Sequence, residues 1–299
     1  MWVGEPGKIN ERLEFLGTRQ TCLYLVKGKD AMIIGGGMAY VVPWLERQFS
    51  QLDLDAADVK YLVIPHSHFD HCGAVPYLQR RFPRLRTLAS EYCRELFSRG
   101  KVINAIASAN ERIMQGVGLG PEYQRLNLKF EGVEVQQVVK DGDVIDLGDG
   151  IQVRFLETPG HTRCSIAAYV TSMKAMFPSD AVPVPLPDGS GLSFPSPQYD
   201  FSLYLESLKK LSRYEVEICA FEHNGVYTGD QASVLLSMAI DQTEQFRHHV
   251  LRLYEESGDL DKVARRLLQE IHKRGELSFL DPELQSTIVK ASIRKMVGS

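Results

Sequence analysis

Histidine and aspartate residues follow apolar, strand-like runs at four points along this chain. Residues 61–64 (YLVI) lead into residues 66–71 (HSHFDH), and His161, Asp180 and His223 follow later runs. Strand ends on one edge of a packed sheet converge, so residues far apart in the sequence can build one site. The chain has 8 histidines, and most of them occupy these positions. The pattern predicts a sheet-based fold whose strand ends meet at a functional site.

The residue types in this pattern are those of a metal site. In an extended loop, residues two apart point the same way, so His66 and His68 can bind one ion together, with Asp70 and His71 turned toward a neighbouring position. Imidazole and carboxylate groups suit zinc, iron or manganese. The carboxylate of Asp180 can bridge two ions. Two ions about 3.5–4 Å apart share a water and generate a hydroxide nucleophile. The predicted cofactors are therefore two divalent metal ions (Zn, Fe or Mn).

Length and composition are those of one large α/β unit. The chain has 299 residues, 44% hydrophobic and 24% charged, which are ordinary globular values. Short apolar runs bounded by turn residues predict strands, and apolar residues at helical spacing predict helices. The expected strands are 11–16, 21–27, 31–34, 61–64, 87–89, 151–155, 176–177 and 218–221. The expected helices are one after Gly37, then 73–82, 91–114, 201–211, 233–257, 259–273 and 281–297.

Two glycine- or proline-rich stretches interrupt these elements. Residues 116–121 (GVGLGP) do not match a phosphate-binding glycine motif after a strand, so they are interpreted as a helix-terminating loop. Residues 183–197 contain five prolines. Long loops over a catalytic face often serve as lids, and an ordered surface connection fits the composition equally well.

Charge and cysteine usage limit the partners and the compartment. The 34 basic and 38 acidic residues give a net charge of −4, so the basic excess that favours nucleic-acid binding is absent. The 5 cysteines form no CxxC pair, which indicates reduced thiols. The start of the chain lacks a signal-peptide pattern, and the apolar runs are too short to span a bilayer. We expect a cytoplasmic protein with no nucleic-acid or membrane partner, and a homodimer is possible.

The motifs resemble those of the metallo-β-lactamase superfamily. Residues 66–73 (HSHFDHCG) are similar to its HxHxDH signature, and 158–162 (TPGHT), 179–181 (SDA) and His223 to its later motifs. The resemblance covers about residues 10–230. It implies an α/β fold, the αβ/βα four-layer sandwich, with an α-helical C-terminal extension. Residues 1–232 would form the catalytic domain, and residues 233–299 would form helices covering the active-site entrance.

The resemblance also implies the roles of the site residues. One metal would be held by three histidines, the other by Asp70 with two histidines, and Asp180 would bridge them. The implied histidine ligands are His66, His68 and His161 for the first metal, and His71 and His223 for the second. Asp70 would also be catalytic, orienting the nucleophile or shuttling its proton. The chain departs from the superfamily at Gly35-Gly36-Gly37, where an acidic residue usually follows the strand.

A narrower resemblance points to a substrate class. Residues 65–78 (PHSHFDHCGAVPYL) and 204–208 (YLESL), together with the length and the helical tail, resemble the quinolone-signal-response (PqsE-type) thioesterases, related to glyoxalase II-like enzymes. This resemblance implies hydrolysis of a thioester or ester of a small acyl substrate. The segment after Asp180 differs, so substrate identity does not transfer. Lactonase, phosphodiesterase and a regulatory binding protein of the same fold remain alternatives.

A redox alternative of flavodiiron type is less favoured by the sequence. Those proteins usually have Glu where this chain has His68, and they carry an appended flavodoxin domain. The tail from Ser233 onward is short and reads as helical. Cys72 is interpreted as a small buried side chain rather than a ligand. Glu222 and Asn224, beside His223, are either partners of the ligands or exposed loop residues.

Overall fold

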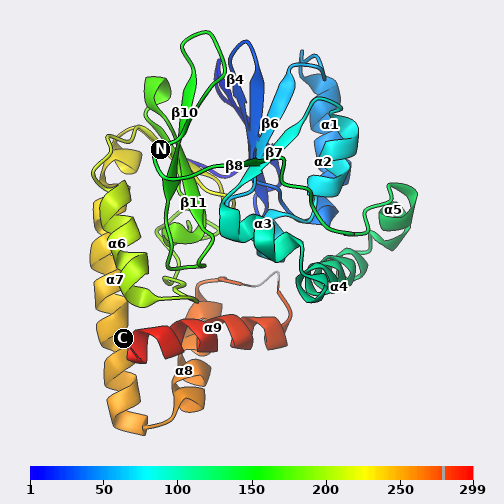
Figure 1. The fold of residues 1–299 in the computed structure, drawn as a ribbon. Helices are drawn as coiled ribbons and strands as arrows, with labels where there is room; N and C mark the ends of the chain where they lie inside the picture. The colour runs from blue at the N-terminus through cyan, green and yellow to red at the C-terminus, as the bar shows by residue number, and fades with distance from the viewer. Residues whose placement is uncertain (278–279, 299) are drawn as a thin grey trace. The chain divides into compact units, whose positions relative to one another are not determined.

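The computed structural model describes residues 1–277 and 280–298 and divides into two compact units (Figure 1). The N-terminal unit comprises Glu5–Leu156 and Ala168–Ser172, and the C-terminal unit comprises Met1–Gly4, Glu157–Ala167 and the chain from Met173 onward. Within the described residues the chain forms two sheets and nine α-helices. The predicted α/β class is therefore confirmed.

A seven-stranded sheet of order β2-β3-β4-β5-β6-β7-β8 lies within the N-terminal unit. The strands from β2 to β5 pair antiparallel, and those from β5 to β8 pair parallel. Buried parallel strands are often continuous apolar runs, which is why β5, β6 and β7 could be recognised from sequence. Strands β2 and β8 are less buried and were not among the expected strands. Their bounds are β2 (Gly7–Asn10), β3 (Leu13–Gly17), β4 (Cys22–Lys27), β5 (Ala31–Ile34), β6 (Val59–Val63), β7 (Arg86–Ala89) and β8 (Gln137–Val138).

Helix α1 (Val42–Gln51) packs against β3, where Gln48 Oε1 accepts a hydrogen bond from Gly17 N at 2.7 Å, and helix α2 (Val75–Arg81) belongs to the same unit (Figure 1). The helix expected after Gly37 is present, and its buried residues Val42, Leu45 and Phe49 have the spacing of one helix face. The remaining elements of this unit are η1 (Ala39–Val41), η2 (Phe69–His71), α5 (Gly120–Arg125) and the antiparallel pair β9 (Val144–Asp146) and β10 (Gln152–Glu157).

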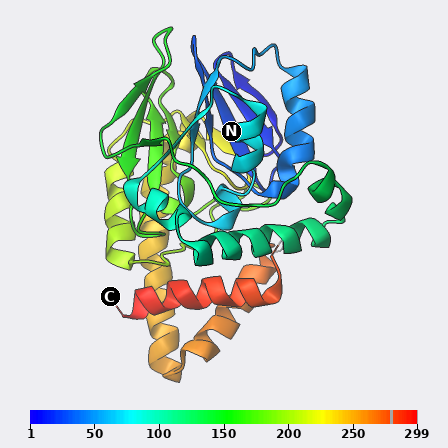
Figure 2. The same cartoon turned by 45° about the vertical axis from the view of Figure 1, so that its right-hand side comes forward.

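The prediction of one helix over 91–114 is wrong. The segment forms two helices, α3 (Glu91–Phe97) and α4 (Gly100–Gly116), as Figure 2 shows. Arg99 between them is extended, with φ −92° and ψ 113°, so it cannot continue the helix. Gly100 follows it, and glycine is among the weakest helix formers. The periodicity continued across the break, and for that reason sequence alone did not reveal it.

Strands β1, β14, β13 and β12 are neighbours in that order in the C-terminal unit. Strands β12 and β13 pair parallel, so their carboxyl ends lie at the same edge. The division between the units falls within β11 (Ile166–Val170) and η3 (Thr171–Met173). The other bounds are β1 (Trp2–Val3), β12 (Ala175–Phe177), η4 (Ser179–Ala181), β13 (Ile218–Ala220) and β14 (Val226–Thr228).

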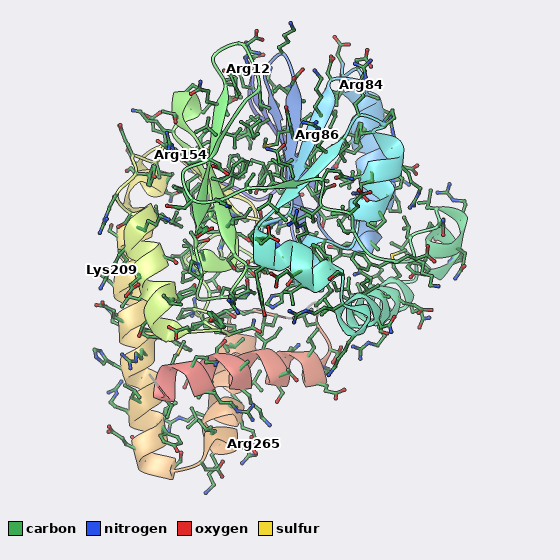
Figure 3. The ribbon with its side chains drawn as sticks, in the orientation of Figure 1. Arg12, Arg84, Arg86, Arg154, Lys209 and Arg265 are labelled. Carbon is green, nitrogen blue, oxygen red and sulfur yellow. The ribbon has the colours of Figure 1, made fainter. Side chains whose placement is uncertain are left out.

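Four helices complete the C-terminal unit: α6 (Phe201–Leu211), α7 (Asp230–Ser257), α8 (Leu260–Lys273) and α9 (Pro282–Val297). Three of them begin at an aspartate, since the side chains of Asp200, Asp259 and Asp281 each accept a hydrogen bond from a first-turn amide of α6, α8 and α9. Figure 3 labels Lys209 on α6, whose Nζ lies 3.2 Å from Glu244 Oε1 on α7.

The helices α7 to α9 confirm the expected C-terminal helical extension. The proposed domain boundary at residue 232 and the covering of a site entrance stay predictions. Of the predicted extension, Ser278, Phe279 and Ser299 lie outside the described residues. Among the helices of the described residues, none is both long enough and apolar enough to cross a bilayer.

Candidate metal-binding residues

The histidine-rich run of the N-terminal unit begins three residues after β6. His66 and His71 are fully buried, and His66 Nε2 lies 3.2 Å from His68 Nδ1. The rings of His66 and His71 have centroids 4.1 Å apart. Asp70 Oδ2 lies 3.7 Å from His71 Nε2, and the Asp70 side chain keeps 15% of its exposure. The structure therefore brings the four predicted donors of this run together.

Gly36 supports the loop that carries His71. Its amide donates to the carbonyl of His71 at 3.1 Å, and its own carbonyl accepts from Ala74 N at 3.0 Å. A Cβ on Gly36 would lie 2.4 Å from the His71 carbonyl oxygen and 2.5 Å from Val75 Cγ2. The absence of an acidic side chain at residues 35–37 thus has a steric reason at Gly36. A side chain there would clash with the backbone of the loop that carries His71.

Asn110 of α4 fixes the same loop from the other side. Its side chain is buried, accepts from Ala39 N at 2.8 Å and donates to the Phe69 carbonyl at 3.3 Å. Asn110 thus ties η1 and η2 to one helix. Sequence analysis missed this residue, although a polar side chain in line with Ile106 and Met114 on the buried face of α4 is a usable signal.

We expect Asn110→Ala to lower the free energy of unfolding by about 1–3 kcal/mol, because it leaves the buried Ala39 amide without its acceptor, whereas the Phe69 carbonyl still accepts from Gly73 N. Urea denaturation followed by circular dichroism measures this change. Asn104→Ala, on the exposed face of the same helix, is the matched control. Equal effects of the two substitutions would contradict the bridging role of Asn110.

In the C-terminal unit, Asp180 and His223 lie just beyond the carboxyl ends of the neighbouring parallel strands β12 and β13. His223 is buried at 7% exposure, and the Asp180 side chain retains 15%. Parallel neighbours end at the same edge, so both positions lie at one edge of this sheet, and their role as ligands stays a prediction.

His161 is held by the close approach of its loop to helix α6. Gly160, at φ +139°, has no room for a side chain, because a Cβ there would lie 2.2 Å from Tyr204 Cα. The Gly160 carbonyl accepts from the amides of Tyr199 and Asp200, both at 3.0 Å. Ser207 Oγ donates to the Pro159 carbonyl at 2.7 Å. Helix α6 therefore fixes the backbone on which His161 stands.

The hydrogen bond of His161 to Ser196 determines which ring nitrogen faces Asp180 with a lone pair. His161 Nδ1 lies 2.7 Å from the Ser196 carbonyl, which can only accept, so Nδ1 carries a proton. In the neutral ring, Nε2 then presents a lone pair, and it lies 3.3 Å from Asp180 Oδ2. A lone pair beside a carboxylate is repulsive unless a proton or a metal ion lies between them. This arrangement fits a metal ligand.

The nearby Tyr204 hydroxyl stays neutral. The side chain is fully buried, and burial raises the pKa of Tyr204 well above its ordinary value, with the negative charge of Asp180 acting in the same direction. A phenol that keeps its proton adds no negative charge beside the donors.

A residue with positive φ adjoins each donor of the C-terminal unit. Gly160 precedes His161, Ser179 (φ +51°) precedes Asp180, and Asn224 (φ +60°) follows His223. Non-glycine residues are uncommon in this region, and such strain clusters at functional sites. We name these three positions the turn residues. Each places an unusual backbone conformation beside a candidate ligand.

The structure shows the surroundings of three residues that adjoin candidate ligands in the sequence: Cys72, Glu222 and Asn224. Cys72 is fully buried and its thiol lies 3.2 Å from the His68 carbonyl, as the interpretation of a small buried side chain requires. Glu222 is buried rather than an exposed loop residue. Asn224 Nδ2 donates to the Pro185 carbonyl at 2.7 Å. Both polar neighbours of His223 therefore belong to the packed structure around it.

A family model, curated relatives and solved structures relate this chain to known proteins. Residues 16–223 match the family model for the metallo-β-lactamase superfamily. The anaerobic nitric oxide reductase flavorubredoxin of Salmonella typhi is 31% identical over 191 residues, 60% of this chain and 33% of that protein. The chain thus spans about a third of the length of such curated relatives.

Solved structures show the same fold at low identity. A metallo-β-lactamase family protein from Thermus thermophilus superposes with a TM-score of 0.66 at 16% identity, over 95% of this chain and 93% of that one. A metallo-β-lactamase from Cronobacter sakazakii gives 0.61 at 19% identity, over 85% and 99%. At these identities the likeness concerns the fold.

Proposed function

Because this chain belongs to the metallo-β-lactamase superfamily, we propose that it is a metal-dependent hydrolase acting on a thioester or ester of a small acyl compound. The proposed ligands are His66, His68, Asp70 and His71 of the N-terminal unit and His161, Asp180 and His223 of the C-terminal unit. Five imidazoles and two carboxylates form a donor set suited to two divalent ions.

The observation that carries the proposal is the pair His161–Asp180. The Ser196 carbonyl holds the proton on Nδ1, and Nε2 faces the carboxylate at 3.3 Å. An acceptor on Nδ1 leaves the Nε2 lone pair directed at the carboxylate, which is the arrangement of a histidine ligand oriented through its other nitrogen. Together with the histidines of residues 66–71, this polarity favours metal ligation.

Bound metal ions would supply Lewis-acid polarisation of a carbonyl and a lowered pKa for water. The chain's own residues then have distinct tasks. Asp70 is partly exposed beside His71, so its carboxylate oxygen can accept a proton from attacking water and return it to the leaving thiolate or alkoxide. The choice of thioester over lactone or phosphodiester rests on the narrower sequence resemblance.

A second candidate is redox chemistry, favoured by the 31% identity to flavorubredoxins. The presence of His68 argues against redox chemistry, because flavodiiron proteins usually have Glu at the corresponding position. The imidazole of His68 lies 3.2 Å from His66 Nε2, so it is placed to act as a donor itself. We therefore rank hydrolysis first.

The deciding experiment assays purified protein against acyl-CoA thioesters, lactones and aryl phosphodiesters, with metal content measured on the same batch. We expect thioester turnover that scales with metal content and is lost after chelation. A parallel anaerobic assay measures nitric oxide consumption with a reduced artificial electron donor. Protein with two bound metals that hydrolyses none of these substrates would contradict the proposal, and nitric oxide consumption would favour the redox candidate.

A further inference from the structure

Ser196 connects the metal-ligand candidate His161 to the C-terminal helices. Its carbonyl lies 2.7 Å from His161 Nδ1, and its hydroxyl lies 3.4 Å from the hydroxyl of Ser292 on α9. Gln198 Nε2 donates to the same Ser196 hydroxyl at 3.2 Å. Ser292 is 1% exposed. The main-chain atom that orients His161 therefore belongs to a residue whose side chain touches the extension.

The backbone just before Ser196 is held by a buried carboxylate. Glu276, between α8 and α9, is 4% exposed, and its Oε2 accepts from Phe194 N at 2.9 Å. Arg274 Nε lies 3.2 Å from the other carboxylate oxygen. Burial raises the pKa of Glu276, whereas the Phe194 hydrogen bond and the Arg274 charge favour its ionised form. A carboxylate is costly to bury, so these contacts fix it in one place.

Further contacts bind the same stretch of backbone. Gln242 of α7 donates to the carbonyls of Leu192 and Ser193, at 3.1 and 2.7 Å, and Arg274 also donates to the Leu192 carbonyl. The Phe194 side chain lies in the hydrophobic cluster of the extension. That cluster includes Phe201, Val250, Leu253, Val263, Ala264, Leu267, Ile271, Val289, Ile293 and Met296.

The end of the proline-rich stretch is thus an ordered connection. Residues 192–196, here called the anchor segment, receive polar contacts from α7, from the α8–α9 connection and from α9. These contacts restrict the backbone of the anchor segment. The Ser196 carbonyl that accepts from His161 is therefore held in place as well.

We propose that Glu276 and Ser292 are positioning residues for the metal ligand His161, acting through the anchor segment. This inference rests on the proposed function, since it takes His161 to be a ligand. Groups that orient a ligating histidine through its second nitrogen typically change metal affinity by about 10–100-fold when they are removed. The extension would then set metal affinity without contributing a ligand.

The test measures zinc affinity of the metal-free full chain by competition with a chelator. Glu276→Leu is expected to weaken binding by about 10–100-fold, and Ser292→Ala by less. Glu276→Gln is expected to restore most of the affinity, because its amide oxygen can accept from Phe194 N. Cobalt-substituted protein gives a second readout, since a rotated His161 changes the absorption spectrum of the bound ion.

Two control variants separate positioning from general loosening. Val289→Ala truncates a core residue of α9 and lowers the melting temperature, and Ser237→Ala removes an exposed hydroxyl on α7. Both are expected to leave zinc affinity within about twofold, well below the range for an orienting group. If Val289→Ala weakened binding as much as Glu276→Leu, or if Glu276→Leu left affinity and cobalt spectrum unchanged, the inference would fail. Wild-type protein that bound no metal would instead refute the proposed function.

Discussion

Replacing Asp180 with alanine is expected to reduce bound metal from about two ions to at most one and to lower hydrolysis at least about a hundredfold. Asp180 Oδ2 lies 3.3 Å from His161 Nε2 at the end of β12, so its removal takes away both a donor and the charge that favours a cation there. Residues that merely orient ligands already cost about 10–100-fold when they are lost. Elemental analysis and thioester turnover on one batch measure the two effects.

The controls for Asp180 vary charge and position separately. Asp180→Asn keeps the shape of the side chain and guards against misfolding of the alanine variant. Asp230→Ala removes an exposed carboxylate from the first turn of α7 and is expected to change neither readout. Unchanged metal content in both Asp180 variants would contradict the bridging role. If an Asp180 variant lost hydrolysis but kept a signalling response that depends on this protein, a regulatory binding protein would be favoured over an enzyme.

Gly160→Ala is expected to destabilise the protein by at least about 3 kcal/mol and to abolish tight metal binding. The added Cβ would lie 2.2 Å from Tyr204 Cα and 2.3 Å from its nitrogen, both backbone atoms of α6. Backbone cannot move aside as a flexible side chain can, so overpacking adds to the strain of φ +139°. Because His161 is the next residue, displacement of the loop also displaces its imidazole.

Thermal unfolding and zinc competition measure these effects of Gly160→Ala. Gly258→Ala is the matched control, since Gly258 also has positive φ (+59°) but nothing lies within 4 Å of the added Cβ. We expect it to cost about 1 kcal/mol, the strain of the left-handed conformation alone. A similar loss in both variants would show that close contact with α6 is unimportant.

The positions of the donors could be predicted from sequence because each follows a run whose type is easily read. The run 61–64 is continuously apolar, and β6 occupies Val59–Val63. The strand expected at residues 151–155 is present as β10, and its burial alternates, with Val153 and Phe155 buried and Gln152 exposed. The break at Arg99 could not be predicted, because a helical pattern continues on both sides of it.

The residues that hold the donors in place were missed for a different reason. Asn110 meets Ala39 across 71 positions, and Ser196 meets Ser292 across 96. Such contacts depend on tertiary packing, which local propensity and periodicity do not encode. Asn110, Ser207 and Ser292 nevertheless share one sequence signal, a small polar residue at the helical spacing of the apolar residues that form the buried face of an amphipathic helix.

The turn residues also restrict how this chain can change during evolution. Each adopts a positive φ directly beside a candidate ligand, so inserting or deleting a single residue there would redirect His161, Asp180 or His223. Natural variation beside these donors should therefore consist of substitutions. Length variation is expected instead where loops touch no donor, such as the turn between β9 and β10 or that between α4 and α5.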